Sequence, residues 1–151
     1  MTLLLMCLHV ILMNIDEHYF NKGRAHSVKE IWSIIIDAAL FFVVILFATF
    51  VPFSQEMIVV YKALAALSMI SIIKNEFFYQ GLKKEERLVH ASLYVLHPII
   101  LFNFYESWQN NYFHTNTNFW MFQVLYVGLG FKTLCYQIIY WNYINENIRE
   151  S

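Results

Sequence analysis

Four long apolar segments restrict what this chain can fold into. Together they contain only three charged residues, which are Asp37, Lys62 and Lys132. A helix that rises 1.5 Å per residue needs about 20 residues to cross a hydrocarbon core of about 30 Å. Each segment therefore predicts one transmembrane helix. The four segments are 32–53, 57–73, 89–104 and 119–141.

A fifth apolar segment, 2–15, is shorter and could be a signal peptide. No basic residue precedes it, and Asn14, Ile15, Asp16 and Glu17 follow where a cleavage site would have small residues. We expect a retained helix that continues to about Phe20. The predicted fold class is all-α, a polytopic membrane helix bundle with about five transmembrane helices, of which the first is short. Residues 1–151 are expected to form a single domain.

Composition supports this class of protein. The chain is 59% apolar and 14% charged, whereas soluble domains are about 45–50% apolar and 25% charged. A net charge of −1 without a separate basic patch argues against a nucleic-acid partner. The expected partner is the lipid bilayer, with further membrane subunits or a homo-oligomer left open. The expected location is the bacterial inner (plasma) membrane.

Basic residues alternate from loop to loop, which predicts an orientation. Three lie in 21–30 and four in 74–88, whereas 54–56 and 105–118 contain none. Basic loops stay on the cytoplasmic side of a membrane. We therefore expect five spans with the N-terminus outside. Small residues concentrate in the third and fifth spans, which we expect to be the most central helices because small side chains allow close packing in lipid.

The fourth span has the most organised polar pattern. Glu86, His90, Tyr94 and His97 fall within a stripe of about 80° when each residue turns the helix by about 100°. Imidazole and phenol groups in hydrocarbon would lack hydrogen-bond partners, so the stripe should face the bundle interior. The alternative to a functional site is interhelical hydrogen bonding by the two histidines.

The first span predicts two polar layers if it contacts the fourth. His9 and Asp16 are seven residues apart on one face, as are His97 and His90. Because the two spans run in opposite directions, His9 should lie level with His97 near mid-membrane. Asp16 should lie level with His90 nearer the cytoplasmic side, so we expect His90 to meet Asp16, Glu17 or Glu76.

Six histidine and acidic residues near this cytoplasmic level are the candidate metal ligands. They suggest a divalent metal as the cofactor. Imidazole and carboxylate suit zinc, iron or manganese, although neither H-E-x-x-H nor C-x-x-C occurs. Solvated side chains at a helix end are the alternative. The candidate metal set is Asp16, Glu17, His18, Glu76, Glu86 and His90.

Asp37 and Lys132 are the remaining deep charges. Each lies about 10 Å from the inner boundary, at 1.5 Å per residue. Equal depth and opposite sign predict an ion pair between helices, or a link through a shared water. A proton-relay carboxylate is the alternative role for Asp37.

Three classes of function remain open from the sequence. The first is a membrane protein with an intramembrane histidine and carboxylate site that binds metal or relays protons. The second is a non-catalytic subunit of a larger membrane complex. The third is a protomer of an oligomeric channel or transporter. We favour the first, and whether the protein is an enzyme stays open.

Overall fold

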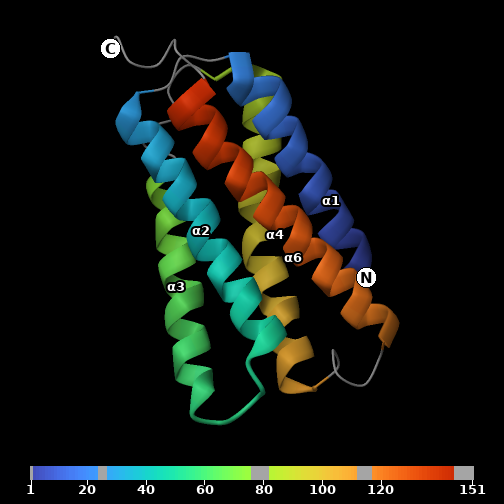
Figure 1. The fold of residues 1–151 in the computed structure, drawn as a ribbon. Coiled ribbons are helices and arrows are strands. Elements are labelled where there is room, and N and C mark those ends of the chain that lie inside the picture. The colour runs from blue at the N-terminus through green and yellow to red at the C-terminus, as the bar shows by residue number, and fades with distance from the viewer. Residues whose placement is uncertain (1, 24–26, 76–81, 112–116, 145–151) are drawn as a thin grey trace.

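The computed structural model describes residues 2–23, 27–75, 82–111 and 117–144, and over these residues it is helical without strands. Five long helices lie side by side and run alternately up and down (Figure 1). Each is long and apolar enough to cross a membrane, which confirms the expected number of helices. They are α1 (Thr2–Ile15), α2 (Val28–Phe50), α3 (Met57–Asn75), α4 (Lys84–Gln109) and α6 (Thr117–Ile139).

Two of the helices continue into π-helical turns. The segment η1 (Asp16–Phe20) extends α1 and is followed by the 3₁₀ turn η2 (Asn21–Gly23), whereas η4 (Tyr140–Ile144) extends α6. The first span with its extension covers Leu3–Phe20, as expected from the sequence. Such π turns are rare and frequently lie at functional sites.

Local chemistry explains where α2 begins and ends. The Ser27 hydroxyl accepts a hydrogen bond of 3.3 Å from the backbone N–H of Glu30, which satisfies one of the free donors of the first turn. At the other end, Val51 is extended, with φ −89° and ψ 124°. The following residue is Pro52, whose ring disfavours helical backbone in the residue before it.

The hydrophobic core lies between α2 and α4. Val44 and Ile45 of α2 and Ile100 and Phe104 of α4 are at most 1% exposed. In their most apolar stretches, 39% of α2 and 33% of α4 are buried, against 22% of α3 and 28% of α6. The expectation that the third and fifth spans are the most central helices is therefore wrong. The small residues of α3 do not make it central, because its main contacts are with α2 and α4, whereas α2 also packs extensively against α6.

Basic residues gather at one end of the bundle. This basic end is formed by η1, the start of α2, the end of α3 and the start of α4 (Figure 1). The arrangement agrees with the alternation of basic loops in the sequence, although it does not assign a side of a membrane. The basic residues described there are Lys22, Lys29, Lys74, Lys83, Lys84 and Arg87.

Candidate functional site

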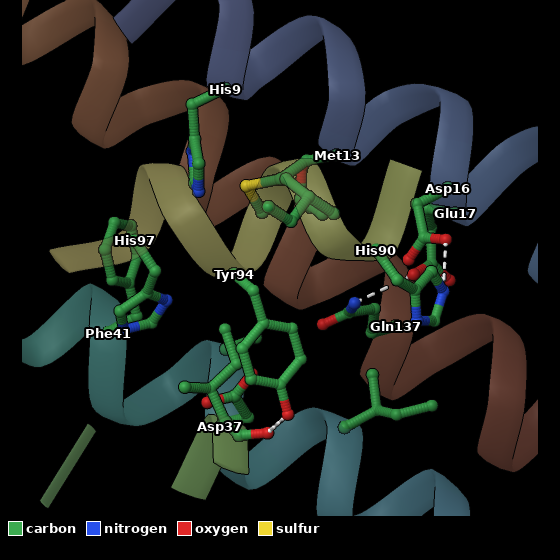
Figure 2. A pocket seen from close by; sticks show the side chains of 15 residues that line it. His9, Met13, Asp16, Glu17, Asp37, Phe41, His90, Tyr94, His97 and Gln137 are labelled. Carbon is green, nitrogen blue, oxygen red and sulfur yellow. Dashed lines mark hydrogen bonds and ion pairs between the residues drawn. The ribbon is translucent and has the colours of Figure 1, made fainter. Parts of the chain in front are cut away.

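A cavity of about 100 Å³ lies among all five helices, on the side of the core toward the basic end (Figure 2). Its polar lining consists of carboxylates, imidazoles, hydroxyls and one amide, and no lysine or arginine is among the described residues that line it. The polar lining residues are His9, Asp16, Glu17, Asp37, His90, Tyr94, His97, Thr133 and Gln137.

A carboxylate and an imidazole are in close contact at the end of this cavity nearest the basic end. His90 Nε2 of α4 lies 2.8 Å from Asp16 Oδ1 of η1. The other carboxylate oxygen, Asp16 Oδ2, accepts a hydrogen bond of 3.2 Å from Asn21 Nδ2. The contact forms because α1 and η1 pack against α4. It confirms the expectation that His90 meets an acidic side chain of the first span.

Glu17, next to Asp16, is buried and firmly held. It is 2% exposed, and its Oε2 accepts a hydrogen bond of 2.8 Å from Gln137 Nε2. Its Oε1 accepts one of 2.6 Å from Trp141 Nε1. The indole and the amide nitrogen are donors only, so both oxygens act as acceptors, as those of an ionised carboxylate do.

The second polar layer lies deeper in the bundle. The rings of His9 and His97 both contact Phe41, with centroids 5.1 Å and 4.4 Å from the Phe41 ring. Tyr126 Oη lies 2.9 Å from His9 Nδ1, and Ser68 Oγ lies 2.8 Å from His97 Nε2. The two histidines therefore lie at a similar depth, as their spacing from Asp16 and His90 predicted.

The polar stripe of α4 faces the bundle interior, which confirms its predicted orientation. Glu86, His90 and His97 are 4–6% exposed. Tyr94, which is half-buried, donates a hydrogen bond through its hydroxyl to the backbone carbonyl of Ile72 in α3. All four side chains therefore lie against other helices.

Asp37 and Lys132 lie in different surroundings. Asp37 lines the cavity, whereas Lys132 is exposed and its ammonium nitrogen lies 3.5 Å from Asn14 Oδ1. The direct pairing of Asp37 with Lys132 stays a prediction. A link through a shared water stays a prediction.

The expected metal ligands are only partly brought together. His18 is exposed and packs edge-on against the Tyr136 ring, with centroids 4.6 Å apart. Glu76 lies outside the described residues. Within residues 2–23, 27–75, 82–111 and 117–144, no three His, Cys, Asp or Glu side chains are placed to hold one metal ion. The structure thus gives no support for a metal centre, and the ligand assignment stays a prediction.

The sequence reasoning missed the polar residues of α6. Gln137 and Trp141 hold Glu17, Tyr126 holds His9, and Gln123 donates a hydrogen bond of 2.6 Å to Thr49 Oγ1. At about 100° per residue, these four residues of the fifth span fall within about 80° of one another. The same test that identified the stripe of the fourth span would have found them.

The chain matches no protein-family model, no curated protein and no solved structure. The class of protein is therefore defined by the fold and the cavity. It is an all-helical bundle of five helices long and apolar enough to span a membrane, with a cavity between the helices lined by histidines and carboxylates.

Proposed function

We propose that this chain is an integral membrane protein whose cavity relays protons between the His90–Asp16 pair and the deeper histidines. Its outer surface supports the membrane setting. Leu4 is 72% exposed, Val59 73% and Ile70 63%. Apolar side chains this exposed on several helices are unfavourable in water, whereas a bilayer removes that cost.

The relay is supported by one observation above all, the 2.8 Å contact between His90 Nε2 and Asp16 Oδ1. This distance lies within the reach of about 2.6–3.2 Å that a proton donor and its acceptor require. Imidazole suits the role because either ring nitrogen can bind or release a proton near neutral pH. Ionisable side chains in membrane helices commonly belong to such relays.

Water in the cavity would connect the two layers. The cavity has a volume of about 100 Å³ and is bounded by His90 and Asp16 at one level and by His9 and His97 at the other. A buried water needs two to four polar partners and about 30 Å³ of liquid volume. The polar lining supplies such partners at both levels. A short chain of waters therefore gives protons a path between the two pairs.

Proton flux into liposomes tests this proposal. Purified protein is reconstituted with the pH-sensitive dye pyranine inside, and a potassium diffusion potential is imposed with valinomycin. We expect faster acidification than in protein-free liposomes, and a large loss of that rate in the Asp16→Asn and His90→Gln variants. His18→Ala is the matched control because His18 is exposed beside the same helix end. Equal flux in protein-free liposomes, or in all variants, would exclude a relay through this pair.

A divalent metal is the second candidate, because an imidazole and a carboxylate from facing helices already meet at His90 and Asp16. A further ligand would have to come from elsewhere, and Glu76 was the expected source. Elemental analysis of the purified protein tests this. Stoichiometric metal that is lost in His90→Ala and at low pH, where protons compete for the imidazole, would favour the metal. Absence of both metal and flux would favour the subunit or channel classes.

A further inference from the structure

One buried oxygen in the cavity, Gln137 Oε1, has no hydrogen-bond partner among the described residues. Gln137 is 5% exposed, and its Nε2 donates to the Glu17 carboxylate. Because a carboxylate of this kind only accepts, the amide nitrogen must face Glu17, and Oε1 must face away from it. Oε1 has no hydrogen-bond partner among the described residues. Figure 2 shows the Gln137 amide directed into the space among the lining side chains.

Such an oxygen indicates a ligand that donates hydrogen bonds. Buried carbonyl oxygens are paired in nearly all proteins, because leaving one unpaired costs free energy. A molecule inside the cavity would supply the donor that Gln137 Oε1 lacks among the described residues.

The charges of the lining indicate that this molecule is a cation. Asp16, Glu17 and Asp37 contribute three carboxylates, and no lysine or arginine is among the described lining residues. Two aromatic rings, of Phe41 and Tyr94, also line the cavity. Aromatic faces attract ammonium groups when water is excluded. An anion would find no lysine or arginine among the described lining residues.

The ligating groups favour an ammonium ion over a metal ion. A divalent metal requires several ligands at one point, which the described histidines and acids do not provide. An ammonium group instead needs separated acceptors, because its N–H bonds point in different directions. Gln137 Oε1 and the carboxylates on other helices have this arrangement.

We propose that this cavity binds a small primary ammonium ion, which donates hydrogen bonds to Gln137 Oε1 and pairs with the carboxylate of Asp37. The cavity volume of about 100 Å³ limits its size. An apolar cavity of about 150 Å³ holds one benzene molecule, so an amine of one to three carbons fits. The inference rests on the proposed histidine and carboxylate site and gives it a ligand other than the proton.

Equilibrium binding of radiolabelled methylammonium to the purified full-length protein in detergent tests the proposal. We expect saturable binding of about one ion per chain. Ethylammonium should displace it, whereas tetramethylammonium, which has no N–H donor and is larger, should not. Absence of saturable binding would overturn the proposal, as would equal displacement by tetramethylammonium, sodium or potassium.

Three variants locate the site. Asp37→Asn and Gln137→Met should each weaken methylammonium binding about tenfold or more, because each removes one hydrogen-bond acceptor for a charged donor. Glu106→Gln is the matched control, since Glu106 is exposed at the far end of α4. Unchanged binding in both cavity variants would overturn the assignment.

Two further measurements keep the result interpretable. If Gln137→Met does not fold, because it also removes a donor to Glu17, heat stability of the unmodified protein replaces it. Methylammonium should then raise the unfolding temperature and tetramethylammonium should not, and equal effects would contradict the proposal. Binding without proton flux in liposomes would contradict only the relay, whereas flux without binding would contradict only this inference.

Discussion

Trp141 Nε1 donates a hydrogen bond of 2.6 Å to Glu17 Oε1 and so joins the π-helical ends of the first and last long helices. Gln137 Nε2 adds a second bond, of 2.8 Å, to the other oxygen of Glu17. Two donors from α6 and η4 thus hold one carboxylate that lines the cavity. The position of Glu17 beside Asp16 therefore depends on residues at the opposite end of the chain.

Replacing Trp141 with Phe should destabilise the bundle. The ring volume is largely kept, but Glu17 loses the Trp141 donor, and a hydrogen bond to a charged group contributes about 1.5–3 kcal/mol. We expect a loss of this size in unfolding measured in mixed micelles. Trp120→Phe is the matched control on the same helix, because Trp120 is 41% exposed. Equal losses in the two variants would show that the bond to Glu17 contributes nothing specific.

The contact between Asp16 and His90 should appear as coupling in a double-mutant cycle. Residues in direct contact couple by about 0.5–3 kcal/mol, whereas distant residues act additively. Asp16→Asn and His90→Gln should therefore cost less together than the sum of their separate losses in free energy of unfolding. The pair Glu106→Gln and His90→Gln provides the additive reference. Additive losses for Asp16 and His90 would mean that their side chains do not interact.

Periodicity and antiparallel helix order were enough to predict both polar layers. His9 and Asp16 are seven positions apart, as are His90 and His97, and this spacing is nearly two helical turns. Because α1 packs against α4 in the opposite direction, His9 lies at the depth of His97 and Asp16 at the depth of His90. The inward orientation of the α4 stripe follows from the cost of placing histidines in hydrocarbon. The sequence could therefore predict these parts of the site once contact between the first and fourth spans was assumed.

The surroundings of Asp37 and Lys132 show where depth alone is insufficient. The sequence gives the depth of a residue along its helix, but a contact also requires that both side chains face each other. At about 100° per residue, Lys132 lies about 180° around the helix from Gln123, which is 1% exposed. Lys132 therefore faces outward, as its exposure shows. The partners of Glu17, by contrast, lie on a polar face of the fifth span that the same regular helical period identifies.

The two glycines of α6 provide a matched test of helix packing. A Cβ atom at Gly130 would lie 3.3 Å from Phe42 Cδ2 of α2, whereas one at Gly128 would meet nothing within 4 Å. Alanine favours helix over glycine by about 1 kcal/mol in water. We expect Gly128→Ala to be neutral or stabilising and Gly130→Ala to be less favourable, because Phe42 must move. Unfolding free energies of the two variants check this, and a more stable Gly130→Ala would contradict the close approach of α2 and α6.

The orientation of the chain is tested by labelling single cysteines from each side of the membrane. Lys22 in η2 is at the basic end, and Asn110, which follows α4, is at the opposite end of the bundle. Both side chains are exposed. After Cys7 and Cys135 are replaced with alanine, a membrane-impermeant maleimide added to intact cells should label Asn110→Cys. It should label Lys22→Cys only after the cells are opened, because basic loops remain in the cytoplasm. Labelling of both positions from the same side would contradict five spans, since an odd number of crossings separates the first loop from the last. Labelling of Lys22→Cys alone in intact cells would keep five spans and reverse the orientation.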